Sequence, residues 1–181
     1  MSTTLAAIIA IFQAASVQTQ PPTPPSSPPP ACDTEGHAGF DFWVGEWDVY
    51  AARDLETKVA DSRIERKHNG CAVIESWMPL RGQGGTSLNH YDVATQRWHQ
   101  KWVGQAPGAV YFEGGVVDGT MVLTGYWPNG AGAGQDALTR MSYKRREDDS
   151  VRQHGEASTD HGLSWQTSFD FIYKPKQDAA K

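Results

Sequence analysis

Glu75 is the residue of this sequence whose neighbours most favour acid–base chemistry. It alternates with Val73 and Trp77 in the segment 71–79, so the three side chains share one face of an extended strand. A carboxyl group held among apolar neighbours loses hydration, and its pKa rises toward the value that a general acid or base needs. Glu75 is therefore our candidate for a buried ionisable group with a function.

The other reactive residue types form no recognisable catalytic or metal-binding pattern. Ser87 and Ser164 lack a GxSxG context, the six histidines show no HxH or HExxH spacing, and the two cysteines form no CxxC motif. We therefore predict no metal ion, no cofactor and no assigned catalytic residue. The enzymatic alternative is a hydrolase or isomerase that uses Glu75 as general acid or base, with Arg140 or Gln100 stabilising developing charge.

The segment SLNHYDVATQRWHQKWV, residues 87–103, predicts a β-hairpin with two different faces. Pairing Asp92 with Arg97 across a four-residue loop keeps the two alternating sets apart, whereas pairing Tyr91 with Arg97 mixes them. The first register places two tryptophans, a tyrosine, two amides and a serine on the inner face. These residues are Ser87, Asn89, Tyr91, Trp98, Gln100 and Trp102.

That inner face has the composition of a small-molecule site. Buried amides need hydrogen-bond partners, and aromatic walls with a few convergent polar groups are typical of ligand pockets. We predict a site for a small, apolar or aromatic ligand formed by Glu75, Trp77, Asn89, Tyr91, Trp98, Gln100, Trp102 and Arg140. The alternative is a polar network that satisfies itself inside a filled barrel.

Short segments rich in Val, Ile, Thr, Tyr, Phe and Trp recur about every ten residues between turn signals, which predicts an all-β fold. The expected strands lie near 41–51, 59–67, 71–79, 86–92, 97–104, 109–116, 120–127, 137–145, 151–158 and 164–174. The turns Asn69-Gly70 and Asp118-Gly119 set two registers, pairing Ile64 with Glu75 and Val116 with Met121. We predict a single antiparallel meander barrel of about eight to ten strands. The facing of the strands near 137–158 stays open.

The sequence predicts an exported protein with one domain. Residues 1–17 combine an apolar run with the small-x-small pattern Ala14-Ala15-Ser16 of a signal peptide, although a plain apolar tail is the alternative. A proline-rich linker is expected over 18–31, the barrel domain over 32–175 and a disordered tail over 176–181. Cys32 and Cys71 would form one disulfide in a periplasmic or secreted protein, or stay unpaired in the cytosol.

Composition narrows the class of partner. The net charge is -5, and the one basic cluster, 144–146, is followed directly by three acidic residues, which argues against nucleic-acid binding. The apolar run near the start is too short to cross a membrane as a helix, so we expect no membrane span in the mature protein. A protein-interaction module that uses exposed aromatics such as Tyr126 is a further alternative. The oligomeric state stays open.

The stretch FDFWVGEWDV carries a resemblance to known barrels. Gly45-x-Trp47 resembles the G-x-W signature of the calycins, the superfamily of lipocalins, fatty-acid-binding proteins and avidins. This resemblance implies that Trp47 closes one end of a barrel and that Gly45 lets neighbouring backbone approach. Trp43, two residues before Gly45, would lie on the same face as Trp47. A haem-binding barrel, as in nitrobindin-like calycins, would need a histidine inside. Our register places His90 and His99 outside and leaves His154 as the other choice.

A wider resemblance covers nearly the whole domain. The segments FDFWVGEWDVY, RIERKHNGC, SLNHYDVATQRWHQKWV, DGTMVLTG and SVRQHGEASTDHGLSWQTSFDFIY together resemble a family of uncharacterised bacterial exported proteins that open FDFW-x-G-x-W. This resemblance implies a calycin-like barrel and export. It assigns no catalytic residue.

Overall fold

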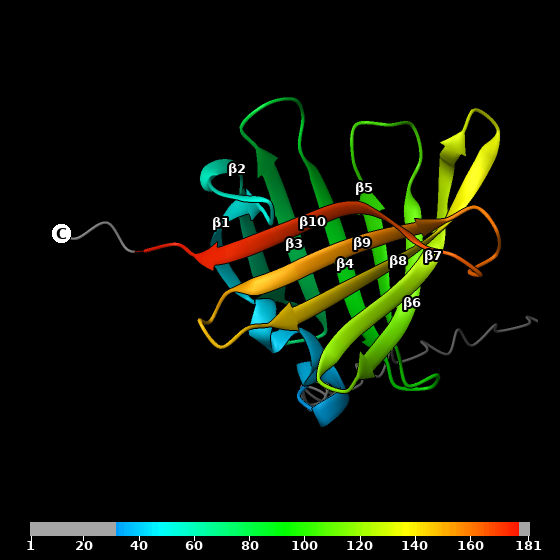
Figure 1. Ribbon diagram of the computed structural model, residues 1–181. Coiled ribbons are helices and arrows are strands. Elements are labelled where there is room, and N and C mark those ends of the chain that lie inside the picture. Colours follow the sequence, from blue (N-terminus) through cyan, green and yellow to red (C-terminus); the bar gives the residue numbers. More distant parts are fainter. Residues whose placement is uncertain (1–31, 178–181) are drawn as a thin grey trace, which may run out of the picture. The chain divides into compact units, whose positions relative to one another are not determined.

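Ten antiparallel strands follow one another around a closed barrel in the computed structural model, which describes residues 32–177 (Figure 1). Each strand pairs with the next, and β1 pairs with β10 to close the sheet. The strands are β1 (Gly45–Ala51), β2 (Asp54–Lys67), β3 (Ala72–Pro79), β4 (Gly85–Asp92), β5 (Arg97–Val103), β6 (Val110–Val117), β7 (Thr120–Gly132), β8 (Gln135–Arg145), β9 (Val151–Ser158) and β10 (Gln166–Pro175). The prediction of an all-β meander barrel is confirmed.

The predicted signal peptide over 1–17, the linker over 18–31 and residues 178–181 of the predicted tail lie outside the described residues. Lys176, the first residue of that tail, donates its backbone N–H to Glu46 O at 2.9 Å, so pairing with β1 continues past the end of β10. No helix within residues 32–177 is long and apolar enough to cross a membrane.

Turn chemistry set the strand registers as predicted. Asn69 and Gly70 have φ of 57° and 87°, the positive values that the central positions of a type I′ turn require. Ile64 consequently faces Glu75 across β2 and β3. In the β4–β5 hairpin Asn89 faces Gln100. A slip of one residue would have exchanged the inner and outer faces, so both registers decide which side chains enter the barrel.

A 3-10 helix, η1 (Glu35–Trp43), occupies the place where we predicted the start of the first strand. The interpretation that Trp43 and Trp47 share one face of a strand is therefore wrong. His37, Phe40 and Trp43 are the buried residues of η1, and their spacing of three puts them on one face of a helix with three residues per turn. β1 begins only at Gly45, after the chain has left the helix.

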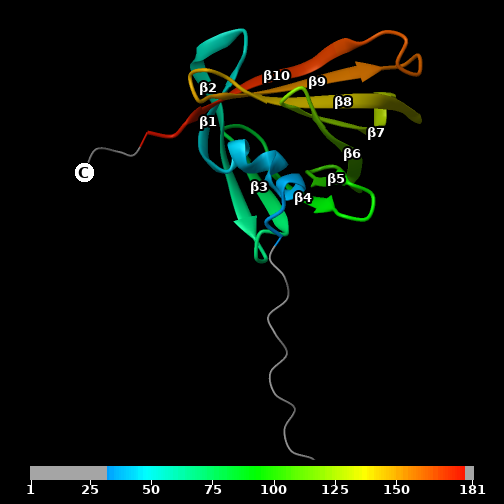
Figure 2. The same cartoon turned by 90° about the horizontal axis from the view of Figure 1, so that it is seen from below.

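η1 lies across one end of the barrel, as Figures 1 and 2 show. Phe40 and Trp43 are fully buried, and Phe40 meets Trp98 edge to face with ring centroids 5.0 Å apart. Trp98 Nε1 donates to Gly36 O at 3.0 Å, and Trp47 Nε1 donates to Trp43 O at 2.9 Å. Aromatic side chains from η1, β1 and β5 therefore close this end of the barrel.

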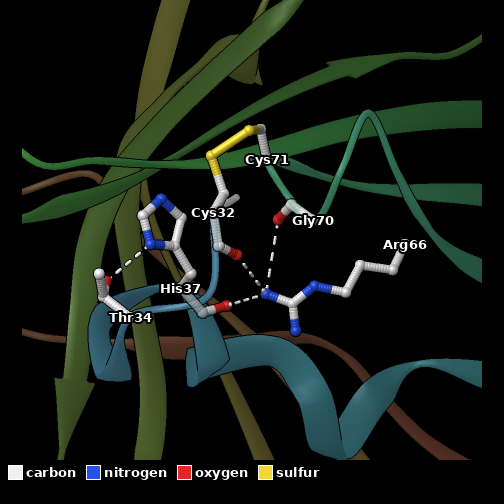
Figure 3. The surroundings of a disulfide bond; sticks show 6 residues. All are labelled: Cys32, Thr34, His37, Arg66, Gly70 and Cys71. Atoms are coloured by element: carbon white, nitrogen blue, oxygen red, sulfur yellow. Dashed lines mark hydrogen bonds between the residues drawn. A yellow bond between two sulfur atoms is a disulfide. The ribbon is translucent and has the colours of Figure 1, made fainter. Parts of the chain in front are cut away.

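A disulfide and an arginine hold this closure in place (Figure 3). Cys32 and Cys71 are bonded, as predicted, and join the start of the domain to the β2–β3 turn. Arg66 Nη2 donates to His37 O at 2.8 Å and to Cys32 O at 3.5 Å, while Nη1 pairs with Asp41. One guanidinium from β2 thus holds η1 at both its first and its last turn.

Candidate functional site

A cavity of about 220 Å³ lies inside the barrel. Trp77, Trp102 and Trp127 line it and also line a wider hollow of about 650 Å³ among the β3–β4 and β5–β6 connections and the last part of β7. These connections lie at the end of the barrel opposite η1 (Figure 1). The cavity therefore meets the outside through an aromatic mouth, while the other end is closed. Its lining consists of Glu75, Trp77, Gln100, Trp102, Phe112, Trp127, Met141, Tyr143, Gln153, Phe169, Phe171 and Tyr173.

A ring of hydrogen bonds between side chains crosses the barrel interior and supplies the polar part of this lining. In ring order its members are Glu75, Ser87, Asn89, Gln100, Tyr143, Gln153 and Tyr173. They come from β3, β4, β5, β8, β9 and β10, so the ring forms only when the barrel closes. All its members are buried, and in such a network each unsatisfied group is costly.

One half of the ring is oriented by a backbone carbonyl. Asn89 Nδ2 donates to Val73 O at 2.9 Å and to Ser87 Oγ at 3.0 Å. Because a carbonyl only accepts, the amide of Asn89 has one possible orientation, with Oδ1 turned toward Gln100. Gln100 Nε2 must then be the donor to Asn89 Oδ1, at 2.7 Å, and it also donates to Tyr143 Oη at 3.1 Å. Both hydrogens of the Gln100 amide are used.

The other half is oriented by its distances. Tyr173 Oη lies 2.6 Å from Gln153 Oε1, a length typical of O–H···O bonds, so Tyr173 donates to Gln153. Gln153 Nε2 donates to Tyr143 Oη at 3.1 Å, a length typical of N–H···O bonds. Tyr143 thus accepts from the amides of both Gln100 and Gln153. Its own hydrogen faces the sulfur of Met141, a weak acceptor 3.8 Å away.

Glu75 closes the ring between the two halves. Ser62 Oγ donates to its Oε1 at 3.1 Å and Ser87 Oγ donates to its Oε2 at 3.2 Å. Burial raises the pKa of Glu75 to about 7, and the hydroxyls of Ser62 and Ser87, which donate to the carboxyl, oppose that rise only in part. Burial, and then the nearby Glu75, also raise the pKa of Tyr143, so this phenol keeps its proton. The ring can therefore be neutral near neutral pH.

The structure brings four of the predicted ligand residues together and separates the others. Glu75, Trp77, Gln100 and Trp102 line the cavity. Asn89 lies in the ring beside it, fully buried. The residues placed elsewhere are Tyr91, Trp98 and Arg140.

Tyr91 and Trp98 have the inward register we predicted, but they pack at the η1 end. The ring of Tyr91 meets His37 at 5.2 Å between centroids. Arg140 lies on the outer face of β8, because its inward neighbours Met141 and Thr139 alternate with it. Its guanidinium pairs with Glu156 at 2.9 Å and covers the ring of Trp165 at 4.1 Å, so the structure gives it no contact with the cavity.

Sequence reasoning missed several residues of the site: Ser62, Met141, Tyr143, Gln153, Phe169, Phe171 and Tyr173. A signal existed in FDFIY, where Phe169, Phe171 and Tyr173 alternate on one face of a strand. No comparable signal marked Gln153, whose strand has a glycine at the next inward position. Gly155 lies under the ring of Phe169, where a Cβ atom would come within 2.3 Å of a ring carbon.

The lining offers little for a metal or a haem. Among residues 32–177, no group of three or more His, Cys, Asp or Glu side chains could hold a metal ion. None of the histidines, all of which lie among the described residues, lines the cavity. His90 and His99 stack on each other outside the barrel with ring centroids 5.2 Å apart, and His154 pairs with Thr167 at 3.0 Å. The residues present therefore do not fit a haem held by a histidine in the lumen.

No protein-family model matches this chain, and a search of curated proteins finds no match to it. The function is therefore inferred from the cavity itself. Its walls are mainly aromatic, its floor is a hydrogen-bonded ring, and its mouth opens among loops. Such a site can hold an apolar molecule and orient it by a few polar groups.

Proposed function

We propose that this protein binds a small, largely apolar molecule in the lumen of its barrel. The observation that carries the proposal is the cavity of about 220 Å³, with tryptophans at its mouth and a polar ring at its floor. A barrel whose interior served stability alone would be filled, since protein interiors pack at nearly crystalline density. Unfilled space lined by aromatic rings favours a ligand over a solid core.

The size and chemistry of the cavity agree on the class of ligand. An apolar protein cavity of about 150 Å³ is known to hold benzene. The lumen is somewhat larger, so it has room for a molecule of one or two rings, with any longer part reaching into the mouth. Burial of such a molecule against Trp77, Trp102 and Phe112 would be favoured by about 25 cal/mol for each Å² of apolar surface removed from water.

Family and location belong to the same proposal. The closed antiparallel barrel is consistent with a calycin-like fold, in which the lumen is the usual binding place. The disulfide between Cys32 and Cys71 supports export to the periplasm or the medium, because such bonds persist in oxidising compartments. A ligand carrier outside the cytoplasm would combine these features.

Titration with N-phenyl-1-naphthylamine, a neutral apolar dye that fluoresces when desolvated, tests the proposal. We expect saturable binding of one dye per chain. Trp127→Leu, which changes both the cavity and the mouth, should weaken binding, whereas Trp165→Leu should not, because Trp165 lines neither hollow. No saturable binding, or equal loss in both variants, would contradict binding in the lumen. Native mass spectrometry of protein purified without detergent would identify a retained ligand.

Catalysis by Glu75 is a second candidate function, favoured by one observation. Glu75 lines the cavity, and burial raises its pKa to about 7, where a carboxyl can both give and take a proton. Once a ligand is identified, incubation with the wild type and with Glu75→Gln separates the two functions. An enzyme would convert the molecule only when Glu75 is present. A carrier would return it unchanged in both cases.

A further inference from the structure

Two polar atoms in the cavity wall are left without a strong partner after every proton of the ring is assigned. Gln100 donates one N–H hydrogen to Asn89 and the other to Tyr143, which leaves its Oε1 free as an acceptor. Within residues 32–177 no group donates to this oxygen, and it is not among the fully buried unpaired atoms. Gln100 Oε1 therefore faces the cavity that its side chain lines.

The second atom is the hydroxyl hydrogen of Tyr143. Its oxygen already accepts two amide hydrogens, from Gln100 and from Gln153. The only acceptor near its hydrogen within the described residues is the sulfur of Met141, at 3.8 Å. A phenol hydrogen gains much more from an oxygen or nitrogen acceptor than from a thioether. The cavity wall thus presents one free acceptor and one poorly used donor on neighbouring side chains.

The same wall offers no positive charge. Within the described part of the chain, the cavity lining contains no lysine, arginine or histidine, and Glu75 is its one carboxyl group. An anionic group in this place would lose its hydration without gaining a cation, which costs several kcal/mol in proteins. A neutral group with both a donor and an acceptor would instead satisfy Gln100 Oε1 and the Tyr143 hydroxyl together.

We propose that the lumen selects ligands whose inner end is a neutral hydroxyl or amide group, held between Tyr143 and Gln100, and rejects carboxylates. This inference rests on the proposed binding in the lumen and adds the chemistry that decides which apolar molecules are bound. The ligand's hydroxyl or N–H donates to Gln100 Oε1, and its oxygen accepts from Tyr143 Oη. The rest of the molecule lies against the tryptophans of the mouth.

Four probes of one shape test it by calorimetry: 2-naphthol, 2-naphthamide, naphthalene and 2-naphthoate, at about pH 6, where the naphthol is neutral and the naphthoate anionic. We expect the naphthol and the naphthamide to bind about tenfold or more tightly than the other two, since a mismatched probe leaves buried polar atoms unpaired. In Tyr143→Phe the preference for naphthol over naphthalene should fall below about threefold. Tyr126→Phe, on an exposed tyrosine, should keep the preference.

The outcomes separate the two proposals. If no probe binds, lumen binding fails, and this inference fails with it. If the four probes bind alike, or the naphthoate binds best, the lumen is a binding site but its inner end is not selective for neutral polar groups. If Tyr143→Phe keeps the full preference for naphthol, Tyr143 is not the donor. Should that variant fail to fold, the ranking of the four probes on the wild type still decides.

Discussion

Tyr173 Oη stands 3.2 Å from Glu75 Oε1, and its single proton is taken by Gln153, only 2.6 Å away on the other side. A hydrogen bond between Tyr173 and Glu75 therefore needs a proton on the carboxyl. With this proton on Gln153, the geometry fits a protonated Glu75 that donates to Tyr173, in agreement with the way burial raises the pKa of Glu75 to about 7. The protonated form of Glu75 therefore completes the ring of hydrogen bonds inside the barrel.

Stability should fall as the pH rises from about 4.5 to about 7, between the pKa of Glu75 in the unfolded chain and its pKa in the folded state. The folded state keeps the Glu75 proton up to a pKa of about 7, whereas the unfolded chain releases it near its ordinary value of 4.5. This contribution is fully present below that ordinary value and is lost as the pH passes the folded pKa, by about 3 kcal/mol in total. Urea unfolding at a series of pH values measures it.

Glu75→Gln supplies the matched control for that pH series. An amide is neutral at every pH and can donate to Tyr173 as the protonated acid does. The variant should therefore lack this part of the pH dependence and exceed the wild type in stability at about pH 9. A variant that is less stable than the wild type across the whole range would show that an amide cannot replace the carboxyl group in the ring of hydrogen bonds.

Trp98 and Trp102 share one face of β5 but should behave differently when truncated. Trp98 is 3% exposed and packs on η1, so Trp98→Ala should cost about 3–5 kcal/mol of stability and little ligand affinity. Trp102 is half-buried and lines the cavity, so Trp102→Ala should cost less stability and most of the dye binding. Lys101→Ala, on the outer face between them, should stay within about 0.5 kcal/mol. Damage concentrated at Lys101 would contradict the register.

The strands and registers of the barrel were predictable because they depend on local signals. Positive-φ turns such as Asn69-Gly70 and a strict period of two fix both pairing and facing. η1 was not predicted because its sequence signal is short. It consists of His37, Phe40 and Trp43 at a period of three, within nine residues. Such a short helix is stabilised by what it covers, which sequence reasoning does not show.

The polar ring was only half predictable for a different reason. Ser87, Asn89 and Gln100 belong to one hairpin, whose register the sequence defines. Tyr173 reaches Glu75 across a separation of 98 residues, which depends on the closure of β1 on β10. Arg140 was expected inside the barrel as part of the ligand site. Asn89 and Gln100 instead pair with each other, with Ser87 and with Tyr143, and Arg140 pairs outside with Glu156.

Removal of the disulfide should lower stability by about 4 kcal/mol, the chain-entropy estimate for a bond that joins residues 39 apart. Thermal unfolding with and without a reducing agent measures this effect on the wild type. The double variant Cys32→Ala, Cys71→Ala should unfold at the temperature of the reduced wild type. Its unfolding temperature should not change when the reducing agent is added. An equal response of wild type and variant to the reductant would show that the bond is not its target.

Gly39 tests the packing of η1 on the barrel. An added Cβ atom would come within 2.6 Å of Trp98 Nε1 and 3.0 Å of a Met121 carbon, both in the closed end. Gly39→Ala should therefore cost about 1–3 kcal/mol, as overpacking does. Gly115→Ala, where the Cβ atom would meet nothing within 4 Å, is the control and should be nearly neutral. Equal stability of the two variants would mean that η1 is not pressed against Trp98.

Ligand affinity should also follow the proton on Glu75. When the carboxyl ionises, it accepts from Tyr173, and the Gln153 amide must turn so that Nε2 donates to Tyr173 and Oε1 accepts the proton of Tyr143. Tyr143 then has no hydrogen to offer a ligand. Among the described residues, the other titratable side chains in the ring of hydrogen bonds around Glu75 are Tyr143 and Tyr173. Burial raises the pKa of both phenols above the ordinary value, so neither titrates near neutral pH.

We therefore expect 2-naphthol to bind more weakly as the pH rises from about 6 to about 8, a range in which a phenol stays neutral. The affinity for naphthalene, which uses no hydrogen bond, should stay constant over the same range. Glu75→Gln should hold the naphthol affinity at its low-pH value, because its amide never ionises. A parallel decline of both probes in the wild type would assign the pH effect to loss of folded protein. A naphthol affinity that rises with pH would mean that the carboxylate itself receives the ligand's hydroxyl.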